Sequence, residues 1–311
     1  MSKIAKRYDV TDCNSPDAIL EKCGLNWEPE LRVATYQGGS DTDNGFRAVV
    51  NPITSKALAF TGKRFAPNSH VRAVNDLATV MRHGTIAPHG VSVWDGGGKI
   101  AFQFRCPDLD VRIGAKSVVS PLLTLVVNHD SGGSDRSFFA DFDFWCRNQG
   151  GMVAKIQGEG IRHSGDILTR FGDLVETRIL DVRTGLTERY SAMKRMADSP
   201  VRLIGRPLLS YFATALDIPQ DEVAAIYEGK KDANGKVEVL SHDGKVLKRV
   251  VDAWRTDDNG AQGTVWHAMS AVTRYTTHNE GRSEGVRMLK SLTGHTDRYA
   301  RAFAAAAALV S

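Results

Sequence analysis

The fold of this chain is decided by residues 124–150, which read TLVVNHDSGGSDRSFFADFDFWCRNQG. Polar and apolar residues alternate on both sides of the segment Ser-Gly-Gly-Ser-Asp at residues 131–135. A period of two is typical of a β-strand. Glycine adopts positive φ without a Cβ clash, and Ser or Asp can hydrogen-bond the local backbone, so this segment suits a hairpin loop. The stretch therefore predicts two antiparallel strands with one apolar face and one charged face.

The charged face carries residues that suit acid–base or metal chemistry. His129 and Asp130 end the first strand. Asp141 and Asp143 lie on the same face of the second strand as Arg147. Imidazoles and carboxylates can bind a divalent metal or transfer protons. These residues lack a diagnostic spacing such as HExxH, so we expect neither catalysis nor a cofactor, and His129, Asp130, Asp141 and Asp143 are only weak catalytic candidates.

The composition is that of a globular protein. The 311 residues are 42% hydrophobic and 24% charged, which is enough for a substantial core in one large or two ordinary domains. No apolar run approaches the roughly 18 residues of a membrane span, and the N-terminus lacks the apolar region of a secretory signal, so we expect a cytoplasmic protein without membrane contact. Four cysteines without metal-site spacing indicate reduced thiols. The formal net charge of +4 permits nucleic-acid binding without requiring it.

Two blocks of the sequence resemble a known family. The first block consists of Asn128, His129, Asp130, the turn 131–134, Cys146 and Asn148. The second consists of Thr264, Trp266, Ala271, Tyr275 and His278. Together they resemble the "domain of unknown function 932" family of phages and plasmids over about residues 25 to 305. The resemblance implies no particular chemistry, and it places the protein in the host cytoplasm if a phage encodes it.

The N-terminal half predicts antiparallel hairpins, a curved sheet and a crossing helix. Ser15 and Gly24 suit the two ends of a short helix, because Ser caps free N–H groups and Gly adopts the left-handed conformation that ends a helix. Residues 27–50 and 90–105 each predict a hairpin, and residues 71–81 have the apolar spacing of an amphipathic helix. One more strand is expected within residues 151–163.

The C-terminal half predicts helices in place of strands. Apolar residues recur at helical spacing over residues 167–196 and 200–227, and again in the last long helix over residues 265–275. The fold class is therefore α+β. We expect a β-rich half over residues 1–165, with one or two helices, and a helical half over residues 166–311 that shares one core with it.

Basic residues occur in the N-terminal hairpins and recur in the C-terminal helices. The cations that we expect to contact nucleic acid are Lys63, Arg64, Arg72, Lys99, Arg105, Arg147 and Arg274. Aromatic residues are interleaved with the cations of the hairpins, namely Phe65, Trp94, Phe104, Phe139 and Trp145. Phosphate contacts from cations and base stacking on aromatic rings are the interactions that bind single strands. The pattern favours single-stranded DNA as the partner.

The phage and plasmid setting supports this interpretation, because such replicons often carry recombination genes. A curved sheet crossed by a helix is similar in outline to the single-strand annealing recombinases of the RecT, Redβ and Erf group. The leading hypothesis is a single-stranded-DNA-binding protein that anneals strands as a homo-oligomer. It needs no nucleotide cofactor, and Gly96–Gly98 precede a strand rather than a helix, which indicates a turn and not a phosphate loop.

Two alternatives stay open. The first is a non-enzymatic interaction protein, such as an anti-defence factor that binds a host protein. The second is a metal-dependent nuclease that uses the acidic hairpin face and a divalent metal. Steep salt dependence of DNA binding separates the leading hypothesis from the first alternative. Metal-dependent loss of DNA length identifies the second.

Overall fold

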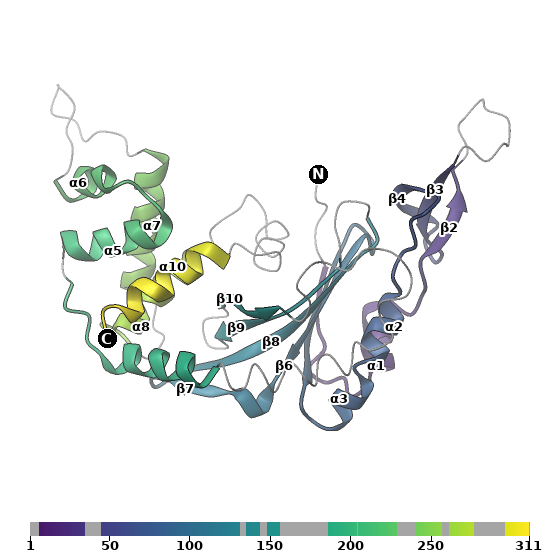
Figure 1. The fold of residues 1–311 in the computed structure, drawn as a ribbon, viewed down its shortest axis with the longest axis horizontal. Helices are drawn as coiled ribbons and strands as arrows, with labels where there is room; N and C mark the ends of the chain where they lie inside the picture. Colours follow the sequence, from purple (N-terminus) through teal and green to yellow (C-terminus); the bar gives the residue numbers. More distant parts are fainter. Residues whose placement is uncertain are drawn as a thin grey trace. The chain divides into compact units, whose positions relative to one another are not determined.

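The hairpin predicted over residues 124–150 is present and belongs to a larger antiparallel sheet (Figure 1). The computed structural model describes residues 6–34, 45–130, 135–143, 148–155, 186–203, 205–228, 241–256, 261–276 and 296–310. The sheet has the order β1-β5-β6-β8-β9-β10, and β7 pairs with β8. These strands are β1 (Lys6–Asp9), β5 (Ala87–Trp94), β6 (Lys99–Arg105), β7 (Val111–Ile113), β8 (Ser117–Asn128), β9 (Arg136–Asp143) and β10 (Asn148–Lys155). The α+β prediction is confirmed, with antiparallel sheets in the N-terminal half and helices in the C-terminal half.

Both faces of β8 are buried, which differs from the expected single apolar face. Leu125 pairs with Phe102 on one face, and Thr124 pairs with Gln103 on the other. All four residues are buried. The alternation along the sequence is real, but the polar positions Thr124 and Asn128 are buried as well. On β8, the polar face of the predicted hairpin is therefore buried.

The hairpin predicted over residues 90–105 is confirmed as β5 and β6, which are joined by a tight turn. Gly96 and Gly97 in this turn have φ values of 72° and 107°. A Cβ on Gly97 would lie 2.5 Å from Cζ2 of Trp27. Only glycine fits there, because any side chain would overlap the buried Trp27 ring. These glycines form a turn against Trp27, as the absence of a following helix predicts.

A second, three-stranded sheet contains β2 (Glu30–Val33), β3 (Phe46–Asn51) and β4 (Lys56–Gly62) in that order. The β2–β3 pairing confirms the hairpin predicted over residues 27–50, whereas β4 was not predicted. Two side chains attach this small sheet to the β5–β6 turn. Asn51 Nδ2 donates to Gly96 O at 3.1 Å, and Lys56 Nζ donates to Asp95 O at 2.7 Å.

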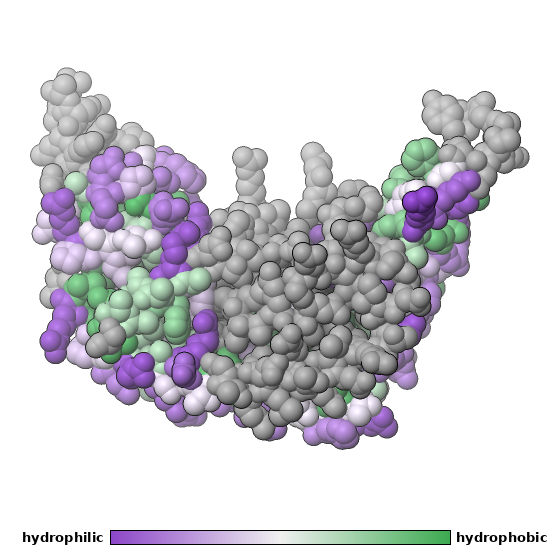
Figure 2. Space-filling view, viewed as in Figure 1, coloured by the Kyte–Doolittle hydropathy of each residue, from purple (hydrophilic) through white to green (hydrophobic). Residues whose placement is uncertain are grey.

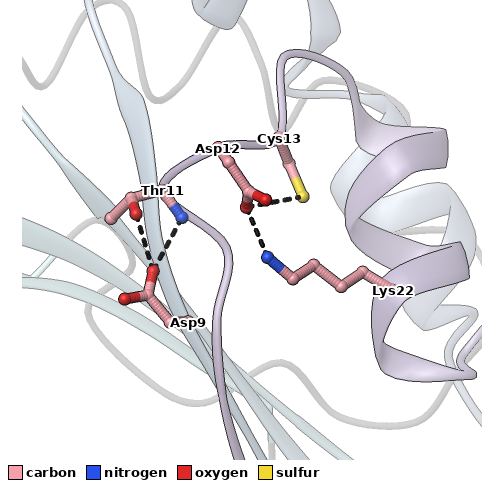
Figure 3. A network of polar contacts seen from close by, with 5 residues as sticks. All are labelled: Asp9, Thr11, Asp12, Cys13 and Lys22. Carbon is pink, nitrogen blue, oxygen red and sulfur yellow. Dashed lines mark hydrogen bonds and ion pairs between the residues drawn. The ribbon is translucent and has the colours of Figure 1, made fainter.

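The short helix predicted between Ser15 and Gly24 is confirmed as α1 (Pro16–Cys23). The Ser15 hydroxyl accepts from Ala18 N, and Gly24 ends the helix with φ of 65°. Figure 3 shows how the segment before α1 is held: Asp9 Oδ1 accepts from Thr11 N at 3.0 Å, and Lys22 pairs with Asp12. The two Thr11 hydrogen bonds lower the pKa of Asp9.

The helix predicted over residues 71–81 is broken into two, α2 (His70–Asn75) and α3 (Ala78–Arg82). The break lies at Asp76 and Leu77, where Leu77 N donates to Val74 O over three residues at 3.0 Å. This tighter bond replaces the ordinary α-helical one. Val74 and Leu77 are nevertheless both buried, so the apolar spacing correctly identifies the buried face although the helix is not continuous.

A buried histidine pair connects α2 to the end of β8. His70 Nε2 lies 2.8 Å from Leu25 O, so this nitrogen carries the proton. His70 Nδ1 lies 3.0 Å from His129 Nε2, and in neutral His70 it accepts a hydrogen bond from His129. The ring of Trp27 contacts the His70 ring edge-on, with centroids 4.6 Å apart. Protonation of His70 Nδ1 would place its N–H against the N–H of His129 Nε2. Burial disfavours the charged form of His70 and lowers its pKa to about 4.

The C-terminal helices pack against one another. They are a helix over residues 186–198, α5 (Arg206–Leu216), α6 (Gln220–Glu228), α7 (His242–Thr256), α8 (Val265–Arg274) and α10 (Thr296–Ala307). Helix α8 confirms the prediction over residues 265–275, with Thr264 as its N-cap, and it is buried on all sides. Helix α10 follows it and packs on α5 and α8, so the expectation that α8 is the last long helix is wrong.

The chain divides into two compact units. The first comprises residues 1–109, 121–140 and 153–184, and the second comprises residues 110–120, 141–152 and 185–311. The predicted boundary near residue 165 and most of the strand expected within residues 151–163 lie outside the described residues. In the described part of the chain, no helix combines the length and apolar character needed to cross a bilayer.

We expect Gly97→Ala to lower the free energy of unfolding by about 2–4 kcal/mol, because it combines a left-handed φ with overlap against Trp27. Gly84→Ala is the matched control, since Gly84 has φ of 72° and open space around its Cβ position. The control should lose only about 1 kcal/mol in urea denaturation. Equal losses in the two variants would show that the Trp27 contact has no effect.

We expect the protein to lose stability as the pH falls from 6.5 to about 4. The pKa of His70 is lower in the folded state than the ordinary value of 6.5, so the folded state binds fewer protons in this window. The loss for one such group is about 3 kcal/mol. Urea denaturation at several pH values should show a shallower pH dependence for His70→Gln than for the wild type. Identical pH profiles for His70→Gln and the wild type would contradict the assignment.

Candidate nucleic-acid interface

The cations predicted to contact nucleic acid do not form one cluster. Lys63 and Arg64 directly follow β4, and Arg72 lies in α2; all three are exposed. Lys99 and Arg105 are half-buried at opposite ends of β6. Arg274 is half-buried in α8 of the second unit, and Arg147 lies outside the described residues. Lys63 and Arg64 are therefore the predicted cations that stand beside the small sheet.

Three of the aromatic residues expected to stack on bases are in the core. Trp94, Phe104 and Phe139 are only 2%, 1% and 0% exposed. They belong to strands of the larger sheet whose faces are buried, so they cannot contact a ligand on the surface. The stacking role predicted for them is wrong. Phe65 is half-buried, and Trp145 lies outside the described residues.

Two other aromatic residues are exposed, and both lie on the small sheet. Phe46 in β3 is 58% exposed, and Phe60 in β4 is 66% exposed. Phe46 pairs with Gly62, and Phe60 pairs with Ala48. Residues two apart on a strand point to the same face, so the two rings are diagonal neighbours on one face of the sheet. Between them lie the small residues Ala48 and Gly62.

Charged side chains stand beside this pair of rings. Arg32 in β2 pairs with Ala48 and therefore stands on the same face, beside Phe60. Glu30 shares that face and forms an ion pair with Arg32 at 2.8 Å. Lys63 follows β4, and its side chain lies against Gly45, the neighbour of Phe46. We call the face formed by Arg32, Phe46, Ala48, Phe60 and Gly62 the aromatic platform, and Figure 2 shows apolar and hydrophilic residues adjoining over these strands.

The sequence contains little signal for this platform. In β3, Phe46 alternates in phase with Ala48 and Val50, which are both buried, so the pattern predicts that Phe46 is buried as well. Phe60 belongs to β4, a strand that was not predicted. The exposure of both rings follows from their place in a small, separate sheet rather than from the residues beside them in the sequence.

The weak catalytic candidates are not assembled into a recognisable active site within the described residues. His129 is fully buried and contacts His70, and the backbone N–H of Asp130 donates to Gly98 O at 2.9 Å. Asp141 and Asp143 belong to β9, but their side chains lie outside the described part of the structure. Among the residues that the structure describes, no group of three or more His, Cys, Asp or Glu side chains is placed to hold a metal ion.

The prediction of reduced thiols is confirmed for the cysteines that the structure describes. Cys13, Cys23 and Cys106 carry reduced thiols. Burial raises the pKa of Cys23 to about 12, so this thiol is not a nucleophile at neutral pH. Cys146 lies outside the described residues.

Comparison with curated proteins and with solved structures gave no match. The similarity in outline to single-strand annealing recombinases therefore remains a fold-level expectation. A family described as "Domain of unknown function (DUF932)" matches residues 57–302, which include Phe60 and all of β4 except Lys56, but not β2 and β3. Since this match covers most of the 311 residues and agrees with the two motif blocks of the sequence, the chain belongs to the DUF932 family.

Proposed function

We propose that this protein binds single-stranded DNA on the aromatic platform. The observation that carries the proposal is the pair of exposed rings, Phe46 and Phe60, side by side on one sheet face with Arg32 next to them. Burial of a phenylalanine side chain contributes about 1.5–3 kcal/mol, so two exposed rings leave a considerable free energy unused in the unbound protein. A ligand with flat apolar faces would recover it.

Nucleic-acid bases have such faces, and stacking on an aromatic side chain contributes about 1–3 kcal/mol per base. The bases of a duplex are already stacked and paired, whereas those of a single strand are free to stack on protein. Arg32 stands beside Phe60, and Lys63 and Arg64 directly follow β4, so the small sheet carries cations that suit the phosphate backbone. The platform therefore favours single strands over duplex DNA.

Strand annealing is compatible with this mode of binding. A base that lies flat on a phenylalanine ring keeps its hydrogen-bonding edge directed along the surface, where a complementary strand can reach it. Stacking and phosphate contacts need no nucleotide hydrolysis. We therefore propose annealing of complementary strands as the role of the bound complex, with no nucleotide cofactor.

The same exposed rings could also bind a host protein, because aromatic residues are common at the centres of protein interfaces. The two partners differ in their response to salt. Binding to DNA releases counterions and weakens steeply as salt rises, whereas a mainly apolar protein interface responds far less. The experiments below use this difference.

We expect Phe46→Ala and Phe60→Ala each to weaken binding of a labelled oligothymidine single strand by about tenfold or more, measured by fluorescence anisotropy. Ile53→Ala is the matched control, since Ile53 is a large exposed residue in the β3–β4 turn and does not belong to the platform. It should bind like the wild type. Binding that is unaffected by both phenylalanine substitutions would exclude the platform, and no binding by the wild type at low salt would exclude DNA.

We expect Lys63→Gln and Arg64→Gln each to reduce the slope of log K against log salt concentration by about 0.7, because each removes one phosphate contact with a single strand. Arg112→Gln is the control, since Arg112 is exposed in β7 of the second unit. Phe46→Ala should lower the affinity without changing the slope. A slope that does not change in either cation variant would show that these side chains do not contact phosphates.

A further inference from the structure

Strand β2 has an outer edge that is open to solvent. All four of its residues, Glu30–Val33, are exposed, and they include Leu31 at 42% and Val33 at 51%. Within the described part of the chain, β3 is the strand that pairs with β2, so the other side of β2 is an edge of the sheet. Exposed edges that carry apolar residues are templates for pairing with another strand.

The direction of the backbone groups on this edge follows from the pairing with β3. Ala34 N donates to Phe46 O, and the register then alternates along β2. In an antiparallel pair, every second residue directs its N–H and C=O to the same neighbour. Glu30 and Arg32 therefore direct these groups to β3, and Leu31 and Val33 direct theirs outward.

We infer that two copies of this chain associate by antiparallel pairing of β2 with β2, about a two-fold axis at Leu31. In this register Leu31 pairs with Leu31 of the second copy, and Val33 N–H donates to Pro29 O of the second copy. Pro29 has no N–H, so Val33 C=O stays hydrogen-bonded to water, and the register is held by the Leu31–Leu31 bonds and by the Val33 N–H bond to Pro29 O in each direction. A register with its axis at Arg32 would pair Leu31 with Val33 of the second copy and form as many backbone hydrogen bonds, so the side chains decide between the two registers.

Charge complementarity selects the register with its axis at Leu31. With the axis at Leu31, Glu30 of each copy stands opposite Arg32 of the other, so both cross-strand pairs join opposite charges. A shift of the axis to Arg32 would place two arginines opposite each other, which is destabilising. The existing Glu30–Arg32 ion pair would then become part of a square of four alternating charges.

Pairing of β2 with β2 would cover the apolar edge and fix the position of one aromatic platform relative to the other. A two-fold axis perpendicular to the sheet keeps equivalent residues on the same face, so the two aromatic platforms would face the same side of one continuous sheet. The two β3 strands would lie about 14 Å apart, which is three strand spacings. The self-association does not depend on the proposed DNA binding, because its contacts are made by β2 alone.

The test measures molar mass by light scattering and sedimentation over a concentration series for the wild type, Glu30→Arg, Arg32→Glu and the double variant that exchanges the two charges. The wild type should approach twice 34.0 kDa. Each single reversal places like charges opposite each other and should raise the dimer dissociation constant about tenfold. The double variant should restore the dimer.

Leu31→Pro removes the outward N–H without removing a bond to β3 and should also give a monomer, with circular dichroism as the check on folding. A wild-type monomer at all concentrations, or a dimer that the single reversals and Leu31→Pro leave intact, would overturn the inference. Single-strand binding by Glu30→Arg is measured in parallel. This variant keeps Phe46, Phe60 and Arg32, so a loss of dimer with retained DNA binding separates the two proposals.

Discussion

The first unit of the structure depends on the enclosure of β8, and above all on how the polar groups at its end are satisfied. Polar groups without partners inside a protein cost about 1–3 kcal/mol each. Asp135 accepts hydrogen bonds from the backbone of Asn128 at 2.7 Å and from Asn68 Nδ2 at 2.5 Å. The N–H groups of His129 and Asp130 both donate to Gly98 O. One carboxylate and one carbonyl thus join β8 to the segment before α2 and to the β5–β6 turn.

The same enclosure separates the aromatic residues into two groups with different uses. Rings on the larger sheet are buried and stabilise the core, whereas Phe46 and Phe60 on the small sheet are exposed. Asn51 and Lys56 hold this small sheet to the β5–β6 turn, which gives the platform a fixed support. Rigid elements position binding residues more accurately than loops do. The proposed site is therefore presented by the packed part of the first unit.

Much of the fold could be predicted from the sequence where the cause is local. Ser15 and Gly24 bound α1, Thr264 caps α8, and glycines form the β5–β6 turn. The resemblance to the DUF932 family is likewise confirmed over residues 57–302. The failures have a non-local cause. Residues 71–81 keep their apolar spacing but break at Asp76, and β4 is recognisable mainly through its pairing with β3.

The sequence by itself determined the order and type of most elements, because caps, turns and alternation act between residues that are close along the chain. Only the tertiary structure decided which aromatic residues are exposed. Phe104 and Phe60 both occur in alternating strands, yet one is 1% and the other 66% exposed. The difference arises because burial depends on the sheet to which a strand belongs and on what packs against it. Alternation shows which residues share a face, and only the packing of distant segments shows whether that face meets water.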